Sequence, residues 1–468
     1  MLIKFTVKNF RSFKDEVSLD MNKLLVNSKN NHGKNHINKS TIGGFETLKA
    51  ATIYGANASG KTNLIKAISL LTKWASGKAN YSSERIFSED VNISDKFLLD
   101  EKGLKSKPSY FSIEFNTSKK AYRYEIAILN GSIVKESLEE ICLEGSLLKE
   151  DIIFSREYDN KEESYKSVKI GKQYTDNIDL SQIESAIQIS ESNKPMLQQL
   201  LKYNFSQKIK ESSFFSDIKD AINWLRNDNL YYEQTKSNME SFELTAIDDG
   251  FRKFLLRLIK KYDLGPIYDI SIEKLSNKEQ ENLFAKIAFF KDNALKLSDS
   301  ETAFAVIGQE RYLIKKEGLS VTIKSIKLVR KNNSNNNIYF GFARESQGTV
   351  KLIDLAMFFY KGFNQNKTIV IDEIESSFHP RIVMDLLKDV LNDEEIANVQ
   401  FIVTTHSECL FDLKIFRGDE IWLMNKRNDG SSYINCLADF KKNNKSIRAD
   451  KIILNDYLLG RYGGVPRI

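Results

Sequence analysis

The stretch Gly55-Ala-Asn-Ala-Ser-Gly60-Lys61-Thr62 decides the fold of this chain, because it matches the pattern G-x-x-x-x-G-K-[ST] in full. The short apolar run AATIYG leads into it, and the helix-like LIKAISLLTKW follows. A strand, a glycine-rich loop and a helix in this order form a cradle whose backbone N–H groups point at phosphate oxygens. We expect Lys61 to reach the β- and γ-phosphates of a nucleotide and the Thr62 hydroxyl to ligate Mg²⁺. The expected nucleotide-binding residues of the loop are Gly55, Asn57, Ser59, Gly60, Lys61 and Thr62. The alternative is a glycine-rich turn with an exposed lysine.

A second motif, Ile369-Val-Ile-Asp372-Glu373, places two carboxylates at the end of a continuous apolar run. Such runs are typical of parallel strands buried on both faces. An acidic pair in this position is costly unless a cation solvates it. We therefore expect Asp372 to hold Mg²⁺, directly or through water, and Glu373 to orient and deprotonate an attacking water. The alternative is that both carboxylates cap the following helix.

His406 ends the next apolar run, VQFIVTTHS. A lone histidine is often a satisfied polar group, but parallel strands bring their carboxyl ends to the ligand crevice of an α/β sheet. We expect His406 to lie beside Glu373 and to contact the γ-phosphate and the attacking water.

The segment Ser346-Gln-Gly348-Thr349 precedes the helix-like VKLIDLAMFFY. A serine and a glycine at a helix N-terminus can form a second anion site. Ser346 alone would more simply be an N-cap, and the segment gains weight from its position just upstream of Asp372.

Composition excludes several classes of protein. The chain has 468 residues, a length that corresponds to two or three domains, and 28% of the residues are charged. Four histidines leave little for a His-rich metal centre, and Cys142, Cys409 and Cys436 are too few and too scattered for a zinc ribbon or disulfide framework. The N-terminus lacks the apolar core of a signal peptide, and apolar runs such as IDLAMFFY are far shorter than the ~20 residues that cross a bilayer. We expect a soluble, cytoplasmic protein without membrane contact. The net charge of +6 permits an acidic partner or nucleic acid without arguing for either.

The hydrophobic pattern predicts an α/β protein with an inserted helical lobe. Residues 3–8 alternate as a strand does, and residues 110–155 read as a meander of antiparallel strands. From about 180 to 297 apolar residues recur three and four apart, which is typical of helices. We therefore predict three parts, listed by residue number: an N-terminal part of the α/β domain, with the phosphate loop and the meander, at 1–175; a helical insertion at 176–300; and a C-terminal part of the same domain at 301–468.

The order of these motifs resembles the ABC-type ATPase head shared by the SMC, RecF and OLD groups. Closer still, NFRSF (9–13), GANASGKT, IDEIESSFHP, TTHS and the terminal GRYGGVP look like the AAA-15/AAA-21 type ATPases of prokaryotic defence loci, notably the abortive-infection AbiL and RloA proteins. The resemblance covers both ends of the chain. It implies an ABC-type head with a mixed sheet, ATP and Mg²⁺ as ligands, and Arg11 near the nucleotide.

The resemblance also implies an assembly. In the family, ATP is sandwiched between two subunits, so that Ser346, Gly348 and Thr349 would act on the partner subunit's nucleotide. The run ESSFHP (375–380) would lie across the same interface. We therefore expect a homo-oligomer, a dimer or larger, with ATP at its subunit interfaces.

One departure from the family concerns the glutamine that senses Mg²⁺ and water. No glutamine occurs from residue 75 to residue 172. Either Glu136 or another residue takes that role, or the sensing geometry differs. This departure counts against a transporter nucleotide-binding subunit.

These expectations favour an ATP-hydrolysing switch of an anti-phage defence system that controls a separately encoded effector, for which a nuclease is one candidate. Roughly 60 residues follow His406, without a second acidic cluster comparable to a nuclease site. A DNA-repair or DNA-bridging ATPase is the alternative, with Lys253, Arg257, Lys260 and Lys261 as a basic stripe that is otherwise a solvated face. A third hypothesis is a scaffold that holds ATP and barely turns it over. His32 and His36 receive no role.

Overall fold

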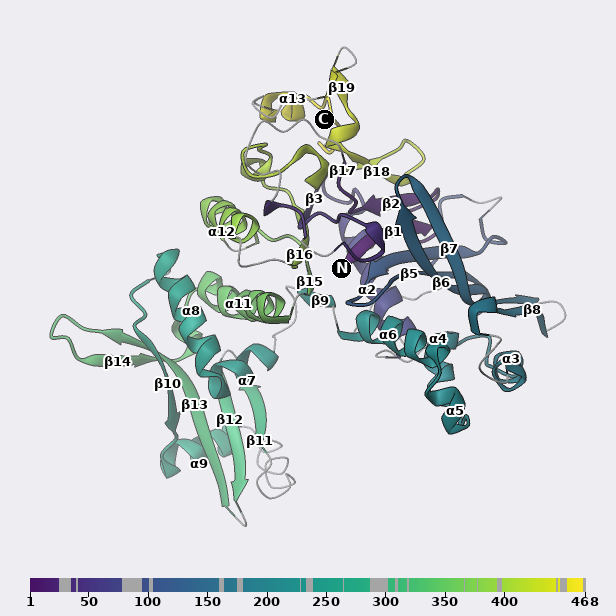
Figure 1. Cartoon of the computed structure of the whole chain (residues 1–468). Helices are drawn as coiled ribbons and strands as arrows, with labels where there is room; N and C mark the ends of the chain where they lie inside the picture. Colours follow the sequence, from purple (N-terminus) through teal and green to yellow (C-terminus); the bar gives the residue numbers. More distant parts are fainter. Residues whose placement is uncertain are drawn as a thin grey trace. The chain divides into compact units, whose positions relative to one another are not determined.

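The structure is a computed structural model of the whole chain (Figure 1). It describes residues 1–24, 35–38, 41–77, 95–100, 104–159, 164–174, 180–227, 229–232, 239–263, 265–286, 302–307, 310–317, 320–365, 367–376, 378–393, 398–442, 445–446 and 453–465. The chain divides into two compact units. Unit 1 consists of residues 1–231 and 365–468, and unit 2 of residues 232–364.

Unit 1 contains a seven-stranded antiparallel sheet built largely from the predicted meander. Its strands, in spatial order, are β2 (Val17–Asp20), β1 (Leu2–Lys8), β4 (Ser109–Asn116), β5 (Ala121–Leu129), β6 (Ser132–Glu144), β7 (Leu147–Asp159) and β8 (Ser164–Ile170). Consecutive strands from β4 onward pair with their neighbours in the chain, as alternating apolar and polar residues predict.

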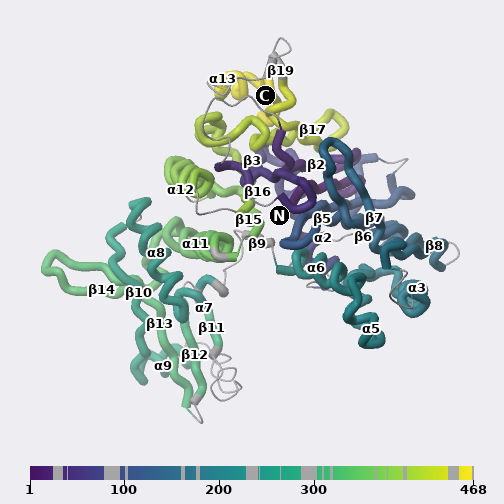
Figure 2. Tube along the Cα trace, in the orientation of Figure 1, coloured from purple at the N-terminus to yellow at the C-terminus, as the bar shows by residue number. Residues whose placement is uncertain are grey.

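The second sheet of unit 1 positions the predicted site. Its order is β18 (Ser432–Cys436), β17 (Ile421–Lys426), β3 (Ala50–Tyr54), β16 (Gln400–Thr405), β15 (Thr368–Ile371) and β9 (Asn229–Tyr232). Strand β3 pairs in parallel with both β16 and β17, and β16 pairs in parallel with β15. In Figure 2 the purple β3 accordingly lies among strands from the C-terminal part of the chain. Every residue of β3, β15 and β16 is buried, which explains their continuous apolar character.

Five helices of unit 1 bury apolar faces in one core shared with both sheets. They are α2 (Lys61–Ala75), α3 (Leu180–Gln188), α4 (Met196–Leu200), α5 (Gln207–Lys210) and α6 (Ser213–Asn227). Unit 1 also contains α12 (Pro380–Asn392) and α13 (Leu454–Leu458). The ring of Trp224 on α6 stacks on Phe115 of β4 with centroids 4.1 Å apart. A hairpin of β19 (Lys441–Lys442) and β20 (Lys445–Ser446) also belongs to this unit. Its short 3-10 turns are Ile42–Gly44, Lys172–Tyr174, Glu408–Leu410, Gly418–Glu420 and Leu437–Asp439.

Unit 2 combines helices with a sheet of its own. Its helices are α7 (Met239–Ile247), α8 (Asp249–Lys261), α9 (Asn277–Lys286) and α11 (Gln347–Gln365), and the 3-10 turn Phe342–Arg344 leads toward α11. The sheet has the order β10 (Asp269–Lys274), β13 (Ser320–Lys331), β12 (Glu310–Glu317) and β11 (Thr302–Ile307), and β14 (Asn337–Phe340) pairs with the far end of β13.

The predicted fold class is confirmed: the chain is α/β, with a mixed sheet around the phosphate loop and an antiparallel sheet at the N-terminus. The compact units, however, do not follow the predicted boundaries at 175/176 and 300/301. Helices α3 to α6, which we assigned to a helical insertion, belong to unit 1 because their apolar faces join its core. Residues 301–364, which we assigned to the ATPase head, lie in unit 2, because β11 to β14 pair with each other and with β10.

Candidate functional site

The phosphate loop has a backbone that only small residues can adopt. Gly60 has φ +115° and Ala58 has φ +59°, both in the left-handed region. A Cβ atom on Gly60 would lie 2.5 Å from the Ser432 Oγ, and one on Gly55 would lie 2.7 Å from the Met424 carbonyl oxygen. The two glycines therefore permit a tight curl at the N-terminus of α2, where backbone N–H groups attract anions. This cradle fits the phosphates of a nucleotide.

Lys61 is drawn back into its own loop. Its Nζ donates to the carbonyl oxygens of Gly55 (2.7 Å) and Ala56 (3.2 Å) and lies 3.4 Å from the His406 Nδ1. Burial lowers the pKa of Lys61 to about 8, against the opposing pull of the three carboxylates of residues 372–375. The ammonium group is thus partly desolvated and lies at the position where phosphate charge is expected.

Thr404 of β16 fixes the acidic pair at the end of β15. Its hydroxyl donates to Asp372 Oδ1 and accepts a 2.8 Å hydrogen bond from the Glu373 backbone N–H. Glu373 has φ +51°, a conformation that is unusual for a glutamate and marks the sharp turn after the strand. The neighbouring strand therefore orients the Asp372 carboxylate and holds the backbone of Glu373.

His406 lies between the lysine and the acidic pair. Its Nε2 is 3.9 Å from Glu373 Oε1, and its Nδ1 faces Lys61. The Glu375 carboxylate accepts a hydrogen bond from the His406 backbone N–H, which holds the end of β16 in place. The structure therefore brings together Lys61, Asp372, Glu373 and His406, four residues that the sequence motifs singled out separately.

Arg11 reaches the phosphate-loop helix through Asn63. Its Nη1 donates to Asn63 Oδ1 (3.2 Å), and the Asn63 amide donates to Ser12 Oγ (2.9 Å). Ser12 in turn accepts through its carbonyl from the Ser432 backbone N–H, and Ser432 Oγ donates to the Ser59 carbonyl (2.6 Å). Asn63 and Ser432 escaped the sequence analysis because neither lies in a motif position. Only their proximity to Gly60 and Arg11 in space reveals them.

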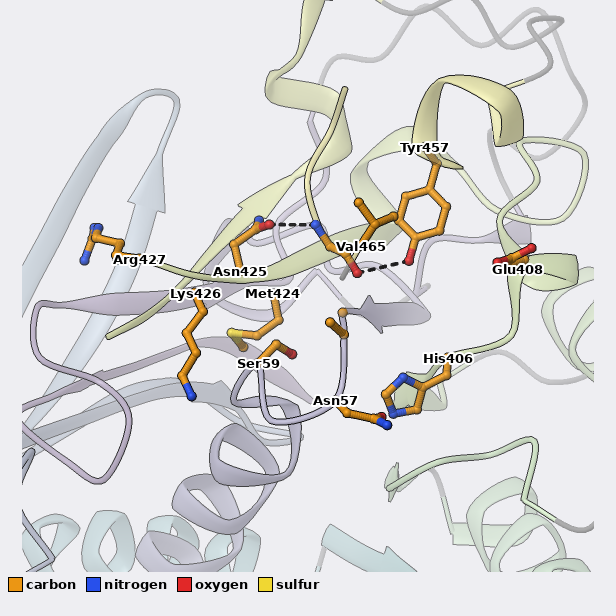
Figure 3. Close-up of a pocket in the computed structure, with 13 residues that line it drawn as sticks. Asn57, Ser59, His406, Glu408, Met424, Asn425, Lys426, Arg427, Tyr457 and Val465 are labelled. Atoms are coloured by element: carbon orange, nitrogen blue, oxygen red, sulfur yellow. Dashed lines mark hydrogen bonds between the residues drawn. The ribbon is translucent and has the colours of Figure 1, made fainter. Parts of the chain in front are cut away.

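A cavity of about 780 Å³ borders the phosphate loop on the side of β17 (Figure 3). The C-terminal segment forms part of its wall. Asn425 Oδ1 accepts a 2.6 Å hydrogen bond from the Gly464 backbone N–H, and the Tyr457 hydroxyl donates to the Gly464 carbonyl. The lining residues are Gly55, Ala56, Asn57, Ser59, His406, Glu408, Met424, Asn425, Lys426, Arg427, Tyr457, Gly464 and Val465. Residues 460–465 of the glycine-rich run are thus held beside the loop that we expect to bind phosphate.

The predicted signature segment belongs to unit 2, unlike the other site residues. Ser346 precedes α11, and its Oγ accepts from the Thr349 backbone N–H at 3.1 Å and lies 2.9 Å from Thr349 Oγ1. Ser346 therefore caps the N-terminus of α11. Ser346 is exposed and Gly348 is half-buried, so this helix start is accessible on unit 2.

Residues 51–412 match the protein family described as "AAA domain, putative AbiEii toxin, Type IV TA system". The chain belongs to this AAA_21 family. It carries a P-loop ATPase domain, and the predicted membership of the AAA-21 type ATPases is confirmed. No match was found among curated proteins.

Three solved structures resemble the AAA_21 chain only distantly. They are an SMC head bound to the C-winged helix domain of ScpA (13% identity, TM-score 0.39, covering 93% of this chain and 96% of that one), the SMC head domain from Thermotoga maritima (12%, 0.37, 93% and 98%), and an SMC head with an extended coiled coil bound to the C-terminal domain of ScpA derived from Pyrococcus furiosus (12%, 0.40, 93% and 95%).

Glu136 does not replace the missing glutamine of the AAA_21 chain. Its side chain is fully buried in unit 1, where it accepts hydrogen bonds from Arg156, the Tyr124 hydroxyl and the Met196 backbone N–H. These donors tie β6 to β7 and to the start of α4. Glu136 is therefore engaged in holding the core together.

Of the three remaining histidines, two have structural partners and one lies outside the described residues. His36 is buried, with its Nδ1 2.8 Å from Glu420 Oε2. The Nδ1 of His379, in the run ESSFHP, accepts from the Arg381 backbone N–H and caps α12. His32 and Ser377 lie outside the described residues.

Two features are absent from the part of the chain that the structure describes. Within the ranges given above, no helix is both long and apolar enough to cross a bilayer. In the same part of the chain, no group of three or more His, Cys, Asp or Glu side chains is arranged to hold a metal ion.

Proposed function

We propose that this chain hydrolyses ATP to ADP and phosphate. The observation that carries the proposal is the convergence of Lys61, Glu373 and His406, with Lys61 Nζ and Glu373 Oε1 on opposite sides of one imidazole. The phosphate cradle of residues 55–62 lies at the base of this cluster. Its glycines allow the backbone to curl closely at the start of α2, and Lys61 supplies a cation for phosphate charge.

Each residue has a defined task in this proposal. Lys61 leaves the carbonyl oxygens of its own loop and neutralises phosphate charge. Glu373 accepts a proton from the attacking water, and His406 donates a hydrogen bond that orients the terminal phosphate. The Thr62 hydroxyl and the Asp372 carboxylate offer the oxygen ligands that Mg²⁺ prefers, and the ion would offset charge on the phosphate oxygens. Arg11 acts through Asn63 to hold the first turns of α2.

The decisive experiment replaces Glu373 by Gln. Because the amide cannot take a proton, we expect turnover to fall by roughly a hundredfold or more while ATP still binds. Turnover is measured by phosphate release and binding by calorimetry. Glu144→Gln, an exposed residue at the far end of β6, is the matched control and should leave both unchanged. Normal turnover in Glu373→Gln would rule out Glu373 as the base.

We further propose that the chain works as a nucleotide-driven switch in prokaryotic defence against phage. Subunits assemble around ATP, with Ser346, Gly348 and Thr349 acting on the nucleotide of the partner, and hydrolysis releases a separately encoded effector. The matched family's description, which names a toxin of a toxin–antitoxin system, supports a defence role. The experiment is a phage challenge of cells carrying the gene and its neighbours. Lys61→Ala should abolish protection if the switch depends on nucleotide.

A DNA-bridging ATPase is the alternative, and one observation favours it. Lys253, Arg257, Lys260 and Lys261 are all exposed on α8, while Phe251, Leu255 and Ile259 are buried on its other face. Neutralising these four cations should reduce DNA-stimulated hydrolysis and the salt dependence of DNA binding. If DNA neither binds nor stimulates the wild-type chain, the defence switch is the better account.

A further inference from the structure

The segment that leads into α11 is attached to the sheet of unit 2 by an ion pair between a buried carboxylate and a partly exposed arginine. The Glu345 side chain is only 1% exposed, although it precedes the exposed Ser346. Arg330 of β13 donates to it through Nη2 at 2.6 Å. Burial raises the pKa of Glu345, and the Arg330 guanidinium opposes that rise. A carboxylate is therefore buried directly beside the signature and is compensated by one arginine.

A second contact holds the same segment from the next strand. Arg311 of β12 stacks over the ring of Phe342, with its Cζ 4.0 Å from the ring centroid. The same guanidinium lies 3.6 Å from the Asp354 carboxylate on α11, which also accepts a hydrogen bond from Ser241 Oγ. The residues before Ser346 and the helix after it are thus fixed to neighbouring strands of one sheet.

Buried ion pairs contribute little net stability, because desolvation of both charges offsets their attraction. In this pair one charge-assisted hydrogen bond joins Arg330 Nη2 to Glu345 Oε2, and the second carboxylate oxygen is also buried. Because such a bond is short and directional, it restricts the positions that residue 345 can take. The Arg330–Glu345 pair is therefore better suited to fixing an orientation than to adding stability.

We propose that Arg330 and Glu345 are positioning residues that set the orientation of Ser346 and the N-terminus of α11 for contact with the ATP held by a partner subunit. This inference rests on the proposed assembly around ATP. The pair lies within unit 2, whereas the phosphate loop belongs to unit 1. Breaking the pair should therefore impair assembly and turnover without changing how a single chain binds ATP.

The test uses charge reversal in full-length protein that also carries Glu373→Gln, so that bound ATP persists. We expect Arg330→Glu and Glu345→Arg each to weaken ATP-dependent assembly by at least about tenfold, because each leaves a buried charge uncompensated. The double reversal should restore assembly substantially. Assembly is measured by sedimentation velocity, and ATP affinity, measured by calorimetry, should stay within about twofold of the parent.

Lys327 and Glu273 provide the matched control. They form an ion pair of 3.1 Å between β13 and β10, with Lys327 as exposed as Arg330 (27% each) and with Glu273 34% exposed. Reversing Lys327 should leave assembly unchanged. If the reversals at 330 or 345 do not fold, as judged by circular dichroism, Arg330→Gln replaces them, since it removes the charge without repulsion.

The possible outcomes test the positioning role of Arg330 and Glu345 separately from the proposed assembly on which it rests. If the Glu373→Gln parent fails to assemble with ATP, the proposed assembly is wrong and the inference falls with it. If the parent assembles and the Arg330 or Glu345 variants assemble equally well, only the positioning role is wrong. Loss in the single variants with recovery in the double variant supports it, because general structural damage would not be repaired by a second reversal.

Discussion

Lys61 shows how burial prepares a single residue for its ligand. A lysine side chain in water has a pKa near 10.5, whereas burial in the loop lowers the pKa of Lys61 to about 8. Above pH 8 the free chain therefore carries an increasingly neutral Lys61, and ATP binding must add a proton to it. We predict that ATP affinity falls by up to about tenfold per pH unit above pH 8, with proton uptake on binding.

Calorimetry of Glu373→Gln between pH 7 and pH 9, in buffers of different ionisation enthalpy, measures both quantities. Lys61→Arg is the control, because a guanidinium stays charged throughout this range. Its affinity should be lower overall but independent of pH. An identical pH profile in the two proteins would mean that another group titrates. The unfolded chain binds the Lys61 proton more tightly than the folded chain, so the buried lysine costs stability at pH 7. This cost falls as the pH rises from about 8 and is gone near pH 10.5.

The motif residues of the site could be predicted from the sequence, whereas the residues that orient them could not. Lys61, Asp372 and Glu373 occupy fixed positions in short motifs, and chemistry restricts what can stand there. Thr404 stands in the TTHS run, but its contact with Asp372 follows from the pairing of two strands that are not adjacent in sequence. Ser432 lies 373 residues from the loop carbonyl that it binds. Glu136 shows the opposite error. Its position in the sequence made it a candidate for sensing Mg²⁺ and water, but its carboxylate is buried in the core and accepts a hydrogen bond from Arg156.

At the scale of elements, periodicity identifies a helix without indicating which core its apolar face joins. Helix α6 reads as part of a helical insertion, yet its Trp224 is 1% exposed and stacks on Phe115 of the N-terminal sheet. We predict that Trp224→Ala lowers the free energy of unfolding of unit 1 by about 3–5 kcal/mol, because a large ring leaves a cavity in a shared core. Chemical denaturation followed by circular dichroism measures this loss.

The control for Trp224 is its neighbour Asn223, which is exposed on the same helix. Asn223→Ala should change the unfolding free energy by less than about 0.5 kcal/mol. ATP added to either variant distinguishes the two domain assignments. If α6 belongs to the ATPase core, Trp224→Ala also weakens ATP protection against unfolding. If a variant loses stability while ATP still protects it against unfolding, α6 belongs to a separate helical lobe, as the sequence analysis predicts.

At the scale of the whole molecule, the two units divide the proposed chemistry between them. Unit 1 holds the phosphate loop, the acidic pair and His406, and unit 2 holds the signature at the start of α11. A signature that acts on a partner subunit gives contacts that depend on protein concentration. A signature that acts within its own chain gives contacts that do not.

Hydrogen exchange of Glu373→Gln with ATP separates these cases. We predict that the phosphate loop is protected at every protein concentration, because ATP binds there to unit 1 of a single chain and needs no second subunit. Protection of residues 346–350 should instead grow with protein concentration and follow assembly measured in parallel. Ser346→Arg, which places a bulky cation at the exposed helix start, should abolish the second protection and leave the first. Equal protection of both segments at the lowest concentration would place the signature contact within a single chain and remove the need for assembly in the switch.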